Sequence, residues 1–264
     1  MAEVSSTLRF LLAYVRLNLS AAIEYRAAFI AQAIGMMLND IVFFIFWALY
    51  FARFPNVAGW GAADIGLLWA IAATSIGLSA ALFGNCTRLA SIIVQGQLDY
   101  YLSLPKNTLL HVLVSRSGLA GWGDVCFGIV AYALFGKLDP GSVVLWLVLV
   151  VLSMLVFVSF NVAAGCLGFW IGNAEATAFQ ANQALINFSL YPGPMFQGWI
   201  RVLLFTAVPA AFVSHLPVDV LRSFEPWRMA GLVGFAALSV GLAVGAFQLG
   251  LRRYESGNLV GLRG

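Results

Sequence analysis

The chain has 264 residues, of which 62% are apolar and 9% are charged, and its mean hydropathy is +0.92. Soluble domains carry roughly 25% charged residues, so this composition excludes a soluble enzyme and predicts an integral membrane protein. The net charge of +3 is spread thinly without a basic run, which argues against a nucleic-acid partner.

Residues 1–26 predict an amphipathic helix that lies on the membrane surface ahead of the first span. Its apolar side chains recur at three- and four-residue steps and share one face, namely Leu8, Leu11, Leu12, Val15, Leu19 and Ala22. Arg9, Arg16, Ser20 and Glu24 lie elsewhere and form a polar strip. We therefore expect an interfacial elbow helix here rather than a cleaved signal peptide.

Five later segments are long and apolar enough to cross the roughly 30 Å hydrocarbon core, which takes about 20 residues of helix. They are residues 27–51, 65–83, 109–135, 143–172 and 229–251. With one further crossing between residues 173 and 228, the sequence predicts six transmembrane helices in a single all-α membrane domain spanning residues 1–264.

The sixth crossing has two interpretations. In the first, residues 174–194 cross the membrane and residues 195–226 form short helices that re-enter the outer leaflet, where protein or a water-filled cavity must surround irregular backbone. In the second, residues 195–215 cross and residues 174–193 form an interfacial helix. Both place the two termini on the same side.

The distribution of lysine and arginine sets the orientation. With the N-terminus inside, nine basic residues lie in or near the cytoplasm: Arg9, Arg16, Arg26, Arg88, Lys106, Arg116, Arg252, Arg253 and Arg263. Four lie outside: Arg53, Lys137, Arg222 and Arg228. This excess favours cytoplasmic termini, including a cytoplasmic tail at residues 252–264.

Residues 85–108 form a long polar loop on the cytoplasmic side, with the sequence GQLDYYLSLPKN at residues 96–107. Leu98, Tyr101 and Leu102 would share one face of a short helix that Pro105 ends. Exposed apolar side chains on a loop favour a surface that docks a partner. The alternative is a helix that merely rests on the lipid head groups.

This loop resembles the segment that carries the coupling helix in permease subunits of ABC-2-type exporters. The sequence YPGPMFQGWIRVLLFTAVPAAFV (residues 191–213) resembles their stretch of short re-entrant helices, and GFWIGNAEA (residues 168–176) also fits. The likeness is greatest to a bacterial subgroup with two related permease chains and a separate ATPase. It extends over nearly the whole chain in layout.

The resemblance implies a permease that exports a hydrophobic or amphiphilic molecule across a bacterial inner membrane. Its partners would be two copies of a P-loop ATP-binding subunit, a second, related permease chain and membrane lipid. It implies that the coupling residues are Leu98, Asp99, Tyr101 and Leu102. It also implies an outer gate, formed by residues 195–226 and the few residues that precede them. The gate residues would be Tyr191, Pro192, Pro194 and Pro209.

The chain itself lacks the sequence GxxxxGK[ST] that cradles nucleotide phosphates. We therefore expect no catalytic residue and no cofactor on this chain, and ATP and Mg²⁺ on the partner ATPase. The three cysteines, Cys86, Cys126 and Cys166, are isolated, so no metal site is expected.

Asp40 and Asp124 lie within two of the predicted spans, each roughly 20 Å from the inner surface by the helical rise. Carboxyl groups at that depth normally face the interior of the bundle, paired or hydrated. They either hold helices together or form an acidic substrate pathway that favours cationic or zwitterionic amphiphiles. Two other functions stay open: a gradient-driven carrier or channel that uses both as ion or proton sites, and a non-transporting scaffold subunit.

Overall fold

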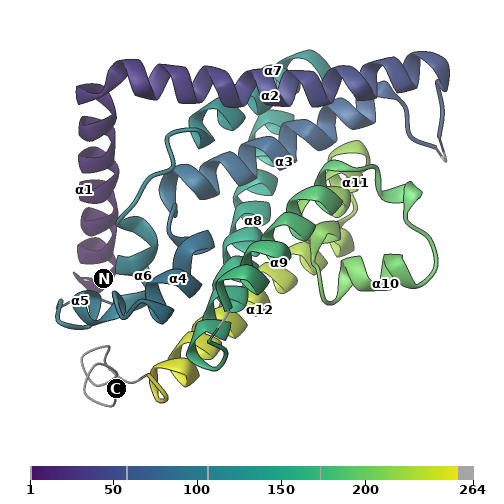
Figure 1. Cartoon of the computed structure of the whole chain (residues 1–264). Coiled ribbons are helices and arrows are strands. Elements are labelled where there is room, and N and C mark those ends of the chain that lie inside the picture. Colours follow the sequence, from purple (N-terminus) through teal and green to yellow (C-terminus); the bar gives the residue numbers. More distant parts are fainter. Residues whose placement is uncertain (1, 58, 106, 173, 255–264) are drawn as a thin grey trace.

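The computed structural model describes residues 2–57, 59–105, 107–172 and 174–254 (Figure 1). The described residues are helical and contain no strand, which confirms the all-α class. Lys106, Arg263 and residues 255–264 of the expected tail lie outside the described residues.

The longer helices are α1 (Ala2–Glu24), α2 (Arg26–Arg53), α3 (Ala62–Leu82), α7 (Gly121–Phe135), α8 (Pro140–Gly165), α9 (Ala174–Leu190) and α12 (Pro226–Leu251). The shorter ones are η1 (Cys86–Arg88), α4 (Leu89–Val94), α5 (Leu98–Leu102), α6 (Thr108–Val114), η2 (Cys166–Phe169), η3 (Gly193–Met195), α10 (Trp199–Phe205), η4 (Ala211–His215) and α11 (Leu216–Arg222). Within the described ranges, α2, α3, α8 with η2, and α12 are long and apolar enough to cross a membrane.

The segment expected as one continuous span over residues 109–135 is broken, so that prediction is wrong in this respect. α6 ends at Val114, and the 15-residue α7 begins only at Gly121. Between them, the N–H of Gly118 donates to the carbonyl oxygen of Ala80 (2.8 Å), and the N–H of Gly84 donates to that of Arg116 (3.0 Å). The break therefore satisfies its backbone groups on the end of α3 instead of within a helix.

α3 lies at the centre of the bundle and packs closely on α7. Leu68, Trp69 and Ile71 of α3 are buried. A Cβ added at Gly77 of α3 or at Gly121 of α7 would collide with the backbone of the other helix. These two glycines thus allow the close approach of helices that small residues permit in membranes.

The region from α9 to α11 is divided into one longer helix and several short ones. α9 is one helix of 17 residues, whereas residues 195–215 contain the end of η3, the short helix α10, and η4 after Pro209. Residues 195–215 therefore do not form one continuous helix.

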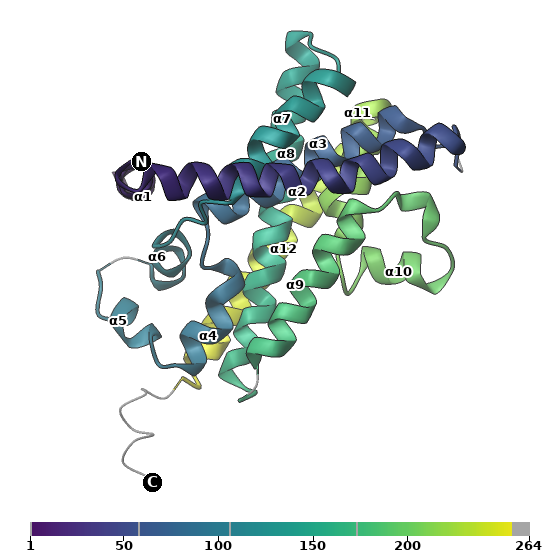
Figure 2. The ribbon, with the colours of Figure 1, turned by 45° about the horizontal axis from the view of Figure 1, so that its top comes forward.

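The N-terminal segment forms a helix of its own, as the sequence predicts. α1 turns away from α2 at Tyr25 and runs beside α6 (Figure 1). α1, α4, α5, α6 and the end of α12 gather at one end of the molecule, which we call the α5 end. α10, α11 and the connection between α2 and α3 lie at the opposite, α10 end (Figures 1 and 2).

The start of α8 offers a simple test of this arrangement. Asp139 caps the helix, because its Oδ1 accepts a hydrogen bond from the N–H of Ser142 (3.0 Å), and Pro140 occupies the first turn. We expect Asp139→Ala to lower the Tm of the purified chain in detergent by a few degrees, and Asp139→Asn, which retains a capping oxygen, to leave it unchanged. An unchanged Tm for the alanine variant would contradict the cap.

The pH dependence of this cap follows from the same contact. The hydrogen bonds from Ser142 lower the pKa of Asp139 below its ordinary value of about 3.9. The stability that the ionised cap contributes is therefore present above the unfolded-state pKa and is lost as the pH falls through the lower folded-state pKa.

Candidate functional site

The short helix α5 is attached to the bundle by one face. Leu98 is buried and packs with Leu89, Ile92 and Leu109, so the expectation that it is exposed for docking is wrong. Its burial follows from the turn at Gly96, which has a positive φ of 72° and directs Leu98 back onto α4.

The outer face of α5 presents a different pair of side chains. Tyr100 is 66% exposed and Leu102 is 43% exposed, whereas Tyr101 is half-buried. Of the predicted coupling residues, Leu102 thus faces outward and Leu98 faces inward. Tyr100 replaces Leu98 in the exposed apolar surface.

Tyr101 connects α5 to the end of α3 through hydrogen bonds. Its hydroxyl lies 2.9 Å from Oγ of Ser115, and the amide nitrogen of Asn85 also donates to that Oγ (2.9 Å) and to the carbonyl oxygen of Val112 (3.0 Å). Ser115 Oγ in turn donates to the same carbonyl (2.8 Å), so the Tyr101 hydroxyl acts as donor. Asn85 is buried just after α3. The chain Tyr101–Ser115–Asn85 therefore joins α5, the end of α6 and the end of α3.

The N-terminal helix joins the same group. The hydroxyl of Tyr14 is hydrogen-bonded to Nε2 of the buried His111, and the rings of Phe10 and Tyr101 lie 5.1 and 5.8 Å from the His111 ring. Asn18 donates to the carbonyl oxygen of Val114 (3.3 Å). α1 is thus held against α6 at both a ring cluster and a backbone contact.

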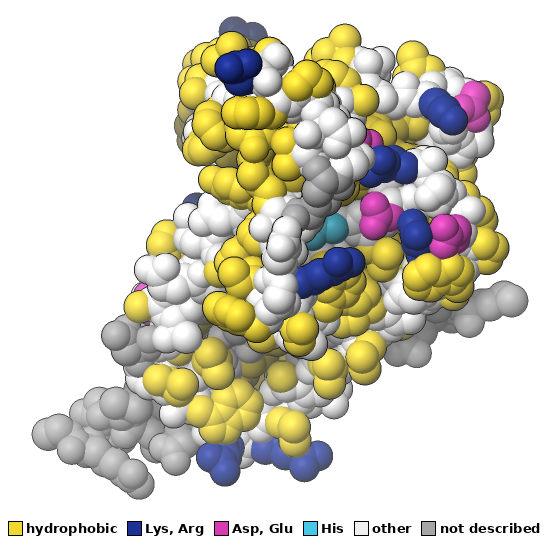
Figure 3. All heavy atoms as spheres, turned by 90° about the vertical axis from the view of Figure 1, so that its right-hand side faces the viewer, with side chains coloured by type: hydrophobic (Ala, Val, Ile, Leu, Met, Phe, Trp, Pro, Cys, Tyr) yellow, Lys and Arg dark blue, Asp and Glu magenta, His cyan; other side chains and the backbone are white. Residues whose placement is uncertain are grey.

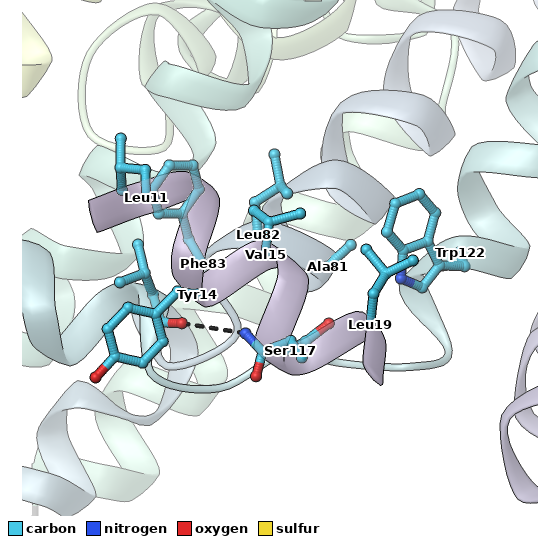
Figure 4. A pocket seen from close by; sticks show the side chains of 11 residues that line it. Leu11, Tyr14, Val15, Leu19, Ala81, Leu82, Phe83, Ser117 and Trp122 are labelled. Carbon is cyan, nitrogen blue, oxygen red and sulfur yellow. Dashed lines mark hydrogen bonds between the residues drawn. The ribbon is translucent and has the colours of Figure 1, made fainter. Parts of the chain in front are cut away.

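A cavity of about 100 Å³ separates α1 from the bundle (Figure 4). Its walls come from Leu11, Val15 and Leu19 of α1, from residues 81–83 and from Trp122. The walls are mostly apolar, and Tyr14 and Asn18, which also line the space, keep their hydrogen bonds to α6.

Asp99, the fourth predicted coupling residue, lies beside the end of α12. Burial, together with the nearby Asp99 carboxyl, raises the pKa of Tyr254 to about 12. α5 therefore also lies beside the segment that follows the last helix.

The predicted gate residues lie at the α10 end. Tyr191 follows α9, and its ring lies 5.4 Å from Trp47 of α2. Pro192 and Pro209 are buried, whereas Pro194 lies in η3 and its side chain is outside the described set. Nε2–H of His215 donates to the carbonyl oxygen of Tyr191 (3.0 Å), which ties η4 to the end of α9.

The α10 end is also tied to α3. The Arg222 side chain of α11 forms an ion pair with Asp64 in the first turn of α3 (3.0 Å) and donates to the carbonyl oxygen of Gly59 (3.1 Å). Both ends of α3 therefore have polar connections, through Asn85 at one end and Asp64 at the other.

Asp40 of α2 and Asp124 of α7 meet inside the bundle. They are 5% and 6% exposed, and their carboxyl groups are hydrogen-bonded to each other. One oxygen of each, Oδ2 of Asp40 and Oδ1 of Asp124, has no hydrogen-bond partner among the described residues. Two carboxyl groups in contact inside the bundle cannot both be ionised at low cost.

Comparison with known proteins identifies the family. A family model described as "ABC-2 family transporter protein" matches residues 37–258, which include α3 to α12 and most of α2. No curated protein and no solved structure matches the chain. Because the matched region covers far more than half of the chain and carries the membrane-spanning helices, the protein belongs to the ABC-2 transporter family and is a permease-type membrane component of transport.

Proposed function

We propose that the chain is the membrane-spanning permease subunit of an ABC-2-type exporter and forms half of a translocation pathway that serves a hydrophobic or amphiphilic substrate. The observation that carries this proposal, beyond the family, is the attachment of α5. One face of α5 is exposed. The other is hydrogen-bonded through Tyr101 to Ser115 at the end of α6, and Ser115 is bonded to Asn85 just after the central helix α3.

In this arrangement, six crossings are formed by α2, α3, α6 with α7, α8, α9 and α12. The α5 end faces the cytoplasm of a bacterium, and the α10 end faces outward across the inner membrane. α1 lies along the inner surface as an elbow. The partners are two copies of a P-loop ATPase, which bind ATP and Mg²⁺, and a second, related permease chain.

α3 provides a mechanical route between the two ends. A push on Tyr100 and Leu102 displaces α5, and the hydrogen bonds of Tyr101 and Ser115 carry that displacement to Asn85 and α3. At the other end, the ion pair between Asp64 and Arg222 passes the shift of α3 to α11. Nucleotide on the partner then biases two arrangements of the outer gate formed around Tyr191 and Pro209.

A second candidate function is a gradient-driven carrier or channel that uses Asp40 and Asp124 as proton or ion sites. The contact between the two buried carboxyl groups favours it. Such a protein needs no ATPase, and α5 would then have only a structural role.

The two functions differ in the partner that they require. We expect the tagged chain, purified in mild detergent from its native host, to bring down a P-loop ATPase and a second six-span chain, both identified by mass spectrometry. Recovery of the chain alone in several detergents would contradict the exporter proposal and favour the carrier.

A further inference from the structure

The α10 end contains a cavity of about 470 Å³, which is within the range of small-ligand sites. Three segments meet around it: the connection before α3, the stretch from η3 to α10, and the stretch from η4 to α11. Its lining side chains include Trp60, Phe196, Arg201, Phe205, His215 and Asp219. Figure 3, which views this end, shows basic and acidic side chains gathered around a histidine and bordered by apolar ones.

Arg201 and Asp219 place opposite charges at this cavity but form no ion pair with each other. Within the described ranges neither forms an ion pair, although the Arg201 charge acts on the Asp219 carboxyl. Two neighbouring arginines do have carboxylate partners: Arg222 with Asp64 (3.0 Å) and Arg228 with Glu225 (3.1 Å). The cavity is therefore bordered by one cation and one anion, each with a side open to a ligand.

His215 lines the cavity with an uncharged ring. Its Nε2–H donates to the carbonyl oxygen of Tyr191, and burial lowers its pKa to about 4, so the ring is neutral at physiological pH. Burial raises the pKa of Asp219, and the guanidinium groups of Arg228, Arg222 and Arg201 act against that rise. A bound ammonium group beside Asp219 would further favour the ionised carboxylate.

The surface around the cavity is typical of a membrane–water interface. Trp199 of α10 and Trp227 at the start of α12 are 73% and 69% exposed, and Val202 and Phe224 are also exposed. Tryptophan is enriched at the depth of the lipid head groups. The cavity is thus placed where a head group can enter it from the side.

We propose that this cavity binds the zwitterionic head group of a phospholipid, with its ammonium group at Asp219 and its phosphate at Arg201. A ligand that carries both charges neutralises both residues, whereas an anion or a cation alone leaves one of them unpaired in a partly buried site. Phe196 and Phe205 provide the aromatic walls that favour an ammonium group. This binding is independent of ATP-driven export, because it requires only the folded chain.

The test is lipid retention by the purified full-length chain. The chain is released from micelles that contain equal amounts of phosphatidylethanolamine and phosphatidylglycerol, and the retained lipid is counted by native mass spectrometry. We expect the wild type to retain phosphatidylethanolamine selectively. Arg201→Gln and Asp219→Asn should each reduce that retention about tenfold, as is typical for the loss of a charge-assisted hydrogen bond.

Matched controls keep this test interpretable. Arg53→Gln and Asp139→Asn make the same chemical changes outside the cavity and should retain lipid as the wild type does. Size-exclusion elution and Tm show whether the cavity variants are folded, and Asp219→Glu, which keeps the charge, should restore part of the retention.

Two results would overturn the proposal: equal retention of both lipids by the wild type, which would indicate binding of an anion alone, or unchanged retention by folded Arg201→Gln and Asp219→Asn. Addition of soluble glycerophosphoethanolamine distinguishes the source of the head group. Displacement of the retained lipid would support recognition of the ammonium–phosphate pair in soluble ligands too, and no displacement would support an anchored lipid as the ligand.

Discussion

Replacing Tyr100 and Leu102 together by alanine is expected to release the ATP-binding subunit from a permease that remains folded. Both side chains lie on the exposed face of α5 and outside the buried core, so their loss removes no core packing. Aromatic and apolar anchors at the centre of an interface typically cost more than 1 kcal/mol each when truncated. Recovery of the ATPase in pull-downs should therefore fall at least about tenfold.

Tyr101→Phe is the matched variant, because it removes only the hydroxyl that donates to Ser115. It should retain the ATPase at wild-type levels and lower ATP-driven transport, since α5 then loses its hydrogen bond toward α3. Wild-type transport by Tyr101→Phe would count against the route through Ser115 and Asn85. Unchanged recovery of the ATPase with the double alanine variant would exclude the exposed face of α5 as its docking surface.

The positions of the long helices could be predicted from the sequence because a membrane span requires a long apolar run. The expected spans 27–51, 65–83 and 229–251 agree with α2, α3 and α12 to within a few residues. What surrounds each helix could not be predicted. α2 and α3 have the same hydropathy of 1.9, yet 6% of the apolar window of α2 and 72% of that of α3 is buried in the chain. Lipid and the protein interior both favour apolar side chains, so the composition of a helix does not tell whether it faces lipid or other helices.

Two predictions were wrong for local reasons: the continuous span over residues 109–135 and the exposed position of Leu98. The break between α6 and α7 depends on backbone bonds to Ala80 and Gly84, which are distant in sequence. Arg116 and the glycines that follow it in an apolar segment were the available signal. From the sequence, Leu98 has the pattern of an exposed loop residue. In the structure, the turn at Gly96 places it against α4.

The candidate sites also depend on contacts between segments that are distant in the sequence. The helical rise places Asp40 and Asp124 at matching depths, but their contact depends on the packing of α2 against α7. At Gly123 of α7, a Cβ would collide with the backbone of Ala33 on α2, which shows how close the two helices are. The cavity between Arg201 and Asp219 combines segments that no motif connects. Its only signal in the sequence is a pair of charges within an otherwise apolar region.

Removing both buried carboxylates, with Asp40→Asn and Asp124→Asn combined, is expected to reduce export of a quaternary-ammonium amphiphile about tenfold. The wild-type pair offers acidic groups to a cationic substrate, and an asparagine pair offers none. Asparagine has nearly the same shape and can both donate and accept, so the contact between α2 and α7 should persist. Transport of the cation, transport of a neutral amphiphile, and recovery of the complex are measured in parallel.

The pattern across these three measurements decides between the roles of the pair. Loss of cation transport with normal recovery and unchanged neutral transport would place the carboxylates on the substrate pathway. Equal loss of both substrates with poor recovery would assign them to helix packing. Unchanged transport of every cationic substrate by a normally assembled complex would exclude the acidic pathway. Asp139→Asn, at an exposed carboxylate at the start of α8, controls for a general effect of net charge, because it removes a negative charge outside the Asp40–Asp124 pair.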